Sequence, residues 1–189
     1  MPAALSAQVP RRASTWLPLS VLAGLLLACT PTFNWRELRL PPTTAVALLP
    51  CKPDRAERTV PLGGVPTPLV VNGCDTGGAT FALMAARLPA GIAPDEVLAA
   101  WQRITLANMR SSVEPQRQPF HPPGGLPLAH AQRLSAQGQQ ADGRAVMAQA
   151  VWTARAHAGG GTELLHAVVY APQPQPEATE AFFAGIKWP

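Results

Sequence analysis

LVVNGCDTGGATFALMAARL, residues 69–88, is the stretch from which the class of fold follows. Its two halves, 69–74 and 79–88, are rich in apolar and β-branched residues, which is typical of buried strands. Between them lie Asp75, Thr76 and two glycines, residue types that form tight turns. The stretch therefore predicts two strands that pair antiparallel across a short turn.

Further strands are expected on both sides of this hairpin. Residues 43–50 form an apolar run typical of a buried strand, and residues 57–62 fit the strand that returns from it. After the hairpin, three stretches mix polar and apolar residues and are separated by glycine-rich turns: 128–136, 144–157 and 162–171. These stretches predict a second group of antiparallel strands.

Two helices are expected, one after each group of strands. Pro94 suits a first helical position, and Asp95 and Glu96 complement the positive end of the helix dipole. Apolar residues then recur at helical spacing as Val97, Leu98, Trp101, Ile104 and Met109. A shorter helix is expected over residues 177–187. This order predicts an α+β fold, in which helices pack on an antiparallel sheet.

The N-terminal residues 1–28 have the zones of a secretory signal peptide. Arg11 and Arg12 precede an apolar run, residues 16–27. This run is shorter than the ~20 residues that a membrane-spanning helix needs, which argues against a plain transmembrane anchor. The two arginines also permit a twin-arginine export signal, although the residues around them match that motif poorly.

Leu26-Leu27-Ala28-Cys29 closes the apolar run and resembles the lipobox of bacterial lipoproteins. The resemblance implies cleavage before Cys29 and a diacylglycerol on this cysteine, which would anchor the protein in a membrane. Thr30, and not an aspartate, follows the cysteine, and the resemblance to enterobacterial lipoproteins then implies sorting to the outer membrane. The expected location is therefore the bacterial envelope, facing the periplasm, with the outer membrane favoured over the inner.

The mature chain is expected to divide into a tether and one domain. Residues 29–42 form a lipidated tether with one alternating segment, 33–40, which fits a first strand or an extended lead-in. Residues 43–189 form a single α+β domain. Within it, residues 111–127 are rich in proline and glycine and predict a long loop, either functional or simply mobile.

Composition limits the partners of the mature chain. Removal of 28 from 189 residues leaves 161, of which 13 are basic and 11 acidic. Nucleic-acid binding needs a basic stripe, and this near-neutral chain shows none, so nucleic acid is not an expected partner. The expected partners are the membrane, through Cys29, and another protein of the envelope.

Cys51 and Cys74 are the cysteines that remain once Cys29 is acylated. In an oxidising compartment such an even pair usually forms a disulfide, and we expect each cysteine to end a strand of the same sheet. A metal pair with a histidine and a redox couple are the alternatives. The spacing is not Cys-x-x-Cys and no histidine is near in sequence, which favours a structural bridge.

The sequence contains no catalytic signature or cofactor motif. The serine nucleophile motif Gly-x-Ser-x-Gly is absent. Asp75-Thr76-Gly77 resembles the motif of aspartic proteases, but it occurs once and in a turn, where these residue types have an ordinary structural role. We therefore expect neither an enzyme nor a cofactor.

Three histidines form the single metal-site hypothesis that the sequence permits. His157 and His166 flank a turn of three glycines and would approach each other in a hairpin, where His130 would join them from a neighbouring strand. None has the i, i+4 spacing of a helical metal site, and no acidic cluster accompanies them. Ordinary strand or turn histidines are the favoured interpretation.

Three short motifs are spread along the mature chain: Phe33-Asn34-Trp35-Arg36-Glu37, Leu49-Pro50 before Lys52-Pro53, and Gly78-Ala79-Thr80-Phe81-Ala82. They resemble those of a group of uncharacterised exported proteins of proteobacteria. The order of elements also resembles that of the PsbP-type α/β/α sandwich. The resemblance implies a fold and a compartment but no activity, because this sandwich serves binding and assembly in unrelated proteins.

The leading functional hypothesis is a non-catalytic, lipid-anchored periplasmic domain that binds a partner protein or helps to assemble an envelope complex. The alternative is a small-ligand or metal-binding module that uses His130, His157 and His166. An envelope hydrolase ranks last, because it would need a deep polar pocket and a catalytic motif.

Overall fold

The computed structural model describes residues 32–189, so the predicted signal peptide 1–28 and Cys29 lie outside the described residues. Nine strands and two helices follow one another in the described chain. The strands are β1 (Arg36–Arg39), β2 (Val46–Leu49), β3 (Asp54–Leu62), β4 (Val65–Thr76), β5 (Ala79–Leu88), β6 (Gln116–Pro119), β7 (Gln132–Gln139), β8 (Ala145–Ala156) and β9 (Thr162–Ala171). The helices are α1 (Pro94–Asn108) and α2 (Pro176–Ala184).

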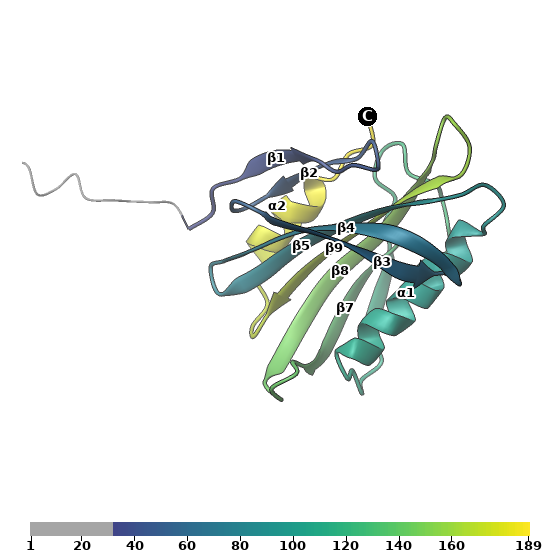
Figure 1. Ribbon diagram of the computed structural model, residues 1–189. Helices are drawn as coiled ribbons and strands as arrows, with labels where there is room; N and C mark the ends of the chain where they lie inside the picture. The colour runs from purple at the N-terminus through teal and green to yellow at the C-terminus, as the bar shows by residue number, and fades with distance from the viewer. Residues whose placement is uncertain (1–31) are drawn as a thin grey trace, which may run out of the picture. The chain divides into compact units, whose positions relative to one another are not determined.

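Seven of the strands form one antiparallel sheet in the order β3-β4-β5-β9-β8-β7-β6 (Figure 1). The last strand of the chain, β9, lies between β5 and β8, so the two groups of strands meet at the centre of the sheet. β1 and β2 form a separate two-stranded antiparallel sheet. The predicted class, an α+β fold with helices on an antiparallel sheet, is confirmed.

The hairpin of β4 and β5 has the predicted turn. Thr76 pairs with Ala79, and the two residues between them, Gly77 and Gly78, have φ of +59° and +74°. Positive φ at both positions is the geometry of a type I′ turn, which matches the twist of the strands and favours glycine. β5 has the predicted bounds, whereas β4 begins four residues before the predicted Leu69.

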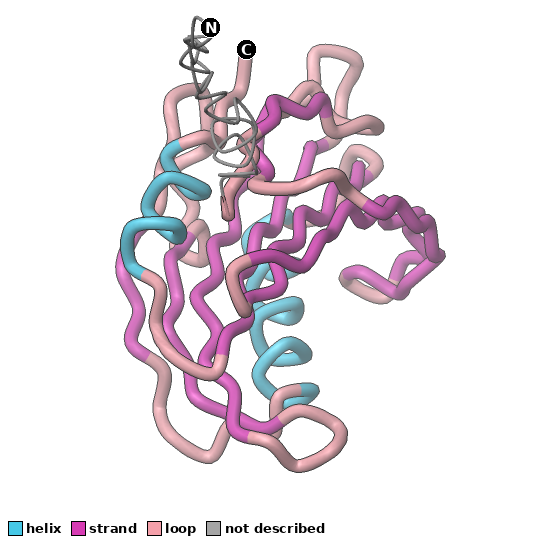
Figure 2. Tube along the Cα trace, turned by 90° about the vertical axis from the view of Figure 1, so that its left-hand side faces the viewer, coloured by secondary structure: helices cyan, strands magenta, loops and turns pink. Residues whose placement is uncertain are grey.

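Alternate residues of the central strand β9 pack in two different cores. Leu164 and Val168 belong to the core that contains α1, and Leu165 and Val169 to the core that contains α2 and the β1–β2 hairpin. Because both faces of the sheet are covered, β9 is buried along nearly its whole length. The two helices therefore lie on opposite faces of the sheet (Figure 2).

The folded domain begins earlier than predicted. Residues 33–42, expected in the tether, belong to the domain, because β1 pairs with β2 and Leu40 is fully buried. Phe33 and Trp35 pack their rings on Phe81, with centroids 6.2 and 6.4 Å apart. Burial of these rings removes apolar surface from water and holds the segment on the sheet. The domain start predicted at residue 43 is wrong, since the compact unit begins at Thr32.

The proline- and glycine-rich segment 111–127 is not wholly a loop. Part of it forms β6, which pairs with β7 at one edge of the sheet. Proline is tolerated in edge strands, so the composition of the segment hides this strand. β7 begins later than the predicted residue 128, and α2 ends before the predicted residue 187. Lys187 instead forms a bridge with Val46 of β2.

Cys51 and Cys74 form a disulfide, with their sulfur atoms 1.99 Å apart. The expectation that both cysteines end strands of one sheet is wrong. Cys51 follows β2 of the small sheet, and Cys74 lies within β4 of the large sheet. The bridge therefore joins the two sheets. It links residues 23 positions apart, which in the chain-entropy model stabilises the fold by about 3 kcal/mol.

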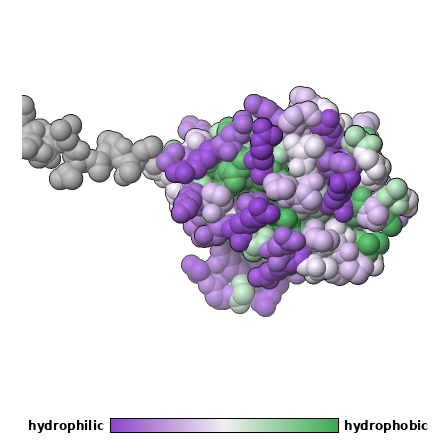
Figure 3. Space-filling model, turned by 45° about the horizontal axis from the view of Figure 1, so that its top comes forward, coloured by the Kyte–Doolittle hydropathy of each residue, from purple (hydrophilic) through white to green (hydrophobic). Residues whose placement is uncertain are grey.

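The surface of the domain mixes polar and apolar side chains on the face that Figure 3 shows. Of the large apolar side chains in residues 32–189, Ile104 and Val113 are the exposed ones, by 48% and 59%. Ile104 was predicted to lie on the apolar, buried face of α1, but its side chain is half-exposed. Neither helix of the described chain is long and apolar enough to cross a membrane.

Candidate functional site

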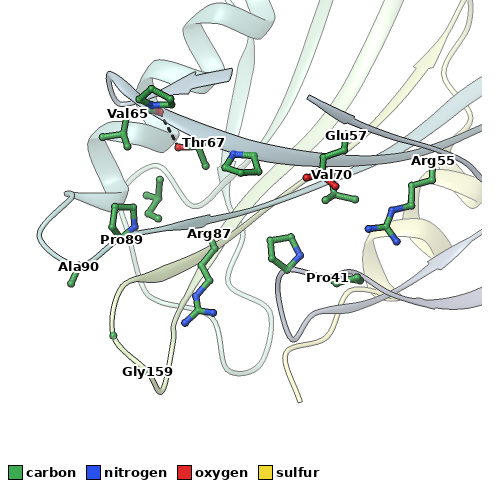
Figure 4. Close-up of a pocket in the computed structure, with 15 residues that line it drawn as sticks. Pro41, Arg55, Glu57, Val65, Thr67, Val70, Arg87, Pro89, Ala90 and Gly159 are labelled. Carbon is green, nitrogen blue, oxygen red and sulfur yellow. Dashed lines mark hydrogen bonds between the residues drawn. The ribbon is translucent and has the colours of Figure 1, made fainter. Parts of the chain in front are cut away.

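A cavity of about 700 Å³ opens on the face of the sheet that α2 covers elsewhere. It lies between the β3–β4 hairpin, the end of β5, the turn from β8 to β9, and the segment that joins β1 to β2 (Figure 4). These segments are distant in sequence, and the strand order brings them together. We call this cavity the arginine groove, after Arg55 of β3 and Arg87 of β5, which line it.

Rigid apolar walls shape the arginine groove. Five of its lining residues are prolines: Pro41, Pro42, Pro66, Pro68 and Pro89. A proline ring fixes φ and has no N–H, so these walls present a preformed apolar surface with few backbone donors to satisfy. Further apolar side chains of the lining are the buried Val70 and Leu88, together with Val65 and Ala90.

Two of the prolines lie inside β4, although a strand paired on both sides would not tolerate them. β4 pairs with β5 from Leu69 onward, whereas its first four residues pair with β3 alone. Residues 65–68 therefore have one free edge. Pro66 and Pro68 leave no ladder bond to β5 unmade, and this free edge lines the groove.

The arginine groove carries more positive than negative charge. Figure 4 shows the side chains of Arg55 and Arg87 extending into the cavity, while Glu57 lies beside Val70. Within residues 32–189, neither arginine forms an ion pair. Both guanidinium groups are therefore available to a carboxylate, which arginine binds through two parallel hydrogen bonds.

A buried carboxylate ties together two of the segments that flank the groove. Glu163 of β9 is 1% exposed and accepts hydrogen bonds from the backbone N–H of Thr44, at 2.9 Å, and from its hydroxyl, at 2.8 Å. Nδ1 of His157 lies 2.7 Å from the other carboxylate oxygen. Thr44 belongs to the segment between β1 and β2, and His157 to the turn between β8 and β9. Glu163 thus fixes two walls of the groove.

The pKa of Glu163 lies below its ordinary value. Burial alone would raise this pKa, because a charged carboxylate loses its hydration, but the hydrogen bonds from Thr44 and His157 outweigh the effect of burial. The carboxylate is therefore charged at neutral pH and keeps both partners in place.

The three histidines of the metal-site hypothesis have separate partners. His157 contacts the buried carboxylate, and His130 donates its backbone N–H to Asp95 at 2.7 Å, with its Nδ1 2.9 Å from the other oxygen of Asp95. His166 is buried in the core and stacks on Trp152. The structure does not bring the three together. In residues 32–189, no three His, Cys, Asp or Glu side chains gather closely enough to hold a metal ion.

The Asp75-Thr76-Gly77 motif closes a hairpin. Asp75 accepts a hydrogen bond from the hydroxyl of Thr80, which is its partner across the turn. The hydroxyl of Thr76 donates to the backbone carbonyl of Thr32 and so connects the turn to the start of the domain. These contacts are the ordinary structural role expected of such residues in a turn.

Comparisons of this chain with protein-family models, with curated proteins and with solved structures found no match. What the site can bind is therefore inferred from the chemistry of its own residues. The resemblance to a group of exported proteins stays a prediction.

Sequence reasoning missed the arginines of the arginine groove and the buried carboxylate that fixes two of its walls. Arg55, Arg87 and Glu163 are single charged residues in three different strands, and none stands in a motif. The one available signal was the 22 prolines of the chain, five of which gather at this site. Their convergence depends on the strand order, which the sequence pattern does not provide.

Proposed function

We propose that this chain is a non-catalytic, lipid-anchored binding domain of the bacterial envelope, and that the arginine groove binds its partner. One observation carries the proposal: two arginines without ion pairs in residues 32–189 stand among rigid proline walls in a cavity of about 700 Å³. Sites that bind ligands are concave, mostly apolar and equipped with a few convergent polar groups.

The chemistry of the groove favours an extended acidic segment of another envelope protein. Arg55 and Arg87 provide guanidinium groups that can bind carboxylates of the partner. Glu57, which also lines the groove, would repel a partner carboxylate placed next to it. The proline rings offer apolar contacts to a peptide that binds in an extended conformation. A preformed surface of this kind limits the entropy that is lost on binding.

The proposed anchor would keep the groove near a membrane. The domain begins at Thr32, so the proposed tether is the three residues 29–31, the first of which, Cys29, would carry the predicted lipid. At ~3.5 Å per extended residue, such a tether reaches about 10 Å. The proposed location, on the periplasmic side of the outer membrane, would therefore restrict the domain to partners at that surface.

The fold that we propose to be related is the PsbP-type α/β/α sandwich, together with the exported proteobacterial group. The placement of α1 and α2 on opposite faces of an antiparallel sheet supports this relation. Sandwiches of this kind serve binding and assembly, which is compatible with the proposed role.

A peptide-binding measurement tests the proposal. The probe is a fluorescent peptide of alternating glutamate and proline, and the matched control peptide has lysine in place of glutamate. We expect anisotropy to show binding of the glutamate peptide that weakens at least tenfold in the double variant Arg55→Ala/Arg87→Ala. Arg58 lies on the other face of β3 from Arg55 and does not line the groove, so Arg58→Ala should leave the affinity unchanged. Equal binding of both peptides, or an unchanged affinity in the double variant, would contradict the proposal.

A further inference from the structure

A second cavity, of about 390 Å³, lies on the opposite face of the sheet, against α1. The β3–β4 hairpin, β5 and β9 form its other walls. Most of its lining is apolar and includes Leu62, Leu69, Met84 and Trp101. We call it the histidine cavity, after His166 of β9, which is one of its lining residues.

His166 is a polar side chain in an apolar position. It is 1% exposed, its ring stacks on Trp152 with centroids 4.1 Å apart, and it makes a T-shaped contact with the ring of Trp101, with centroids 5.3 Å apart. Its Nδ1 lies 3.1 Å from the backbone oxygen of Val151. Because a carbonyl oxygen only accepts hydrogen bonds, Nδ1 must carry the hydrogen.

The second ring nitrogen of His166 is left as an acceptor. Burial lowers the pKa of His166 to about 4, so the ring is neutral at neutral pH and Nε2 has a free lone pair. Within residues 32–189, no hydrogen bond is formed by this Nε2. The fully buried side-chain atoms without a partner in residues 32–189 are Gln132 Oε1, Trp152 Nε1 and Thr179 Oγ1, so Nε2 of His166 is not fully enclosed and a molecule in the cavity can donate a hydrogen bond to it.

The other groups around the cavity are uncharged. Tyr170, Thr105 and Asn108 supply its remaining polar atoms, and no side chain that lines it is ionised at neutral pH. The hydroxyl of Thr105 already donates to the backbone oxygen of Trp101. Ile104, which is half-exposed, also lines the cavity and marks a side that reaches solvent.

We propose that the histidine cavity binds a small, neutral, mostly apolar molecule with one hydroxyl group, which donates its hydrogen bond to Nε2 of His166. An anion would find no cation in the cavity, and a cation would find no carboxylate, so a charged ligand would lose its hydration without compensation. The volume is near the lower end of the ~300–1,000 Å³ of small-molecule sites, which fits a ligand of one or two rings. The proposal does not depend on the arginine groove, which lies on the other face.

Three related probes test this proposal on the full chain: 2-naphthol, naphthalene and naphthalene-2-carboxylate. They share one ring system and differ in having a hydrogen-bond donor, no polar group or a negative charge. We expect calorimetry to show that 2-naphthol binds at least tenfold more tightly than either of the others. We also expect the ¹⁵N resonance of His166 Nε2 to move to lower frequency on binding, because this nitrogen accepts the hydrogen bond.

Two variants complete the test. His166→Phe keeps an aromatic ring between the tryptophans and should abolish the preference for 2-naphthol over naphthalene. His121→Phe replaces a histidine outside the cavity and should leave that preference unchanged. The proposal is overturned if no probe binds, if the carboxylate binds best, or if the wild type binds naphthalene and 2-naphthol equally while the Nε2 resonance stays in place. The NMR result on the wild type decides the matter even if His166→Phe fails to fold.

Discussion

At the level of single residues, the buried Glu163 holds the walls of the arginine groove in place, although it does not line the groove itself. Its carboxylate is 1% exposed, and its partners Thr44 and His157 come from two segments around the arginine groove. A buried charge is stable only when hydrogen bonds replace its hydration, and here three contacts do so. The position of the groove walls therefore depends on one carboxylate in β9.

Replacement of this carboxylate should loosen the groove. We expect Glu163→Gln to lower the free energy of unfolding by about 1–3 kcal/mol, because charged hydrogen bonds at a buried site are lost. The amide proton of Thr44 should exchange faster with solvent. Glu180→Gln is the matched control, since Glu180 pairs with Arg133 while 61% exposed and should contribute less than about 1 kcal/mol. Equal effects of the two substitutions on stability and exchange would refute the role of Glu163.

The burial of His166 should make stability depend on pH. Burial lowers the pKa of His166 from 6.5 to about 4, so the unfolded chain takes up a proton near pH 6.5 and the folded protein only near pH 4. Stability is therefore complete above pH 6.5 and is lost as the pH falls toward 4, by about 3 kcal/mol in total. Urea unfolding at several pH values measures this loss.

His166→Phe provides the comparison, because the other histidines and the carboxylates titrate in both proteins. The difference in unfolding free energy between wild type and variant should change by about 2 kcal/mol between pH 7 and pH 5. A difference that stays constant over this range would show that His166 is not buried in its neutral form.

Single-residue chemistry was predictable where it depends on residue type alone. Cys51 and Cys74 were expected to pair because an even number of cysteines in an oxidising compartment forms bridges, and the structure shows that bridge. The roles of Glu163 and Arg87 were not predictable, because they depend on neighbours that are distant in sequence.

At the level of elements, local pattern and tertiary context contribute differently. β5 and the start of α1 were predicted because an alternating or helical pattern and strong turn residues mark them. The first residues of β4, and all of β6, were missed because proline normally argues against a strand. Both segments have a free edge, and only the strand order reveals that edge. The start of the domain was predicted too late, because Phe33 and Trp35 pack on Phe81, a contact between residues distant in sequence that the local pattern does not reveal.

The turn between β4 and β5 gives a test of that early start. Both of its glycines have positive φ, but a side chain on Gly77 would approach the ring of Phe33 to 2.8 Å, whereas one on Gly78 would meet nothing within 4 Å. Gly78→Ala should cost only the backbone strain of a positive φ, about 1–3 kcal/mol. Gly77→Ala should destabilise the protein more, because the clash with Phe33 adds to the same strain. Thermal unfolding measures both. Identical effects would mean that Phe33 does not pack on this turn.

At the level of the whole molecule, the sheet separates two sites. The arginine groove opens on the face of α2, and the histidine cavity lies on the face of α1, with central strands between them that are buried on both sides. A disulfide and the ring contacts of Phe33 and Trp35 fix the small sheet, and with it one wall of the groove, to the large sheet. In the proposed setting, a tether of three residues holds this rigid unit beside a membrane.

Site-specific photo-crosslinking in intact cells tests the proposed binding role most directly. A photoreactive amino acid replaces Pro66 in the arginine groove, and the same amino acid replaces the exposed Arg103 of α1 as control. We predict one discrete adduct from position 66, none of that size from position 103, and loss of the adduct in the double variant Arg55→Glu/Arg87→Glu. The same adducts from both positions, or an adduct from position 66 that survives the charge reversal, would contradict binding at the groove.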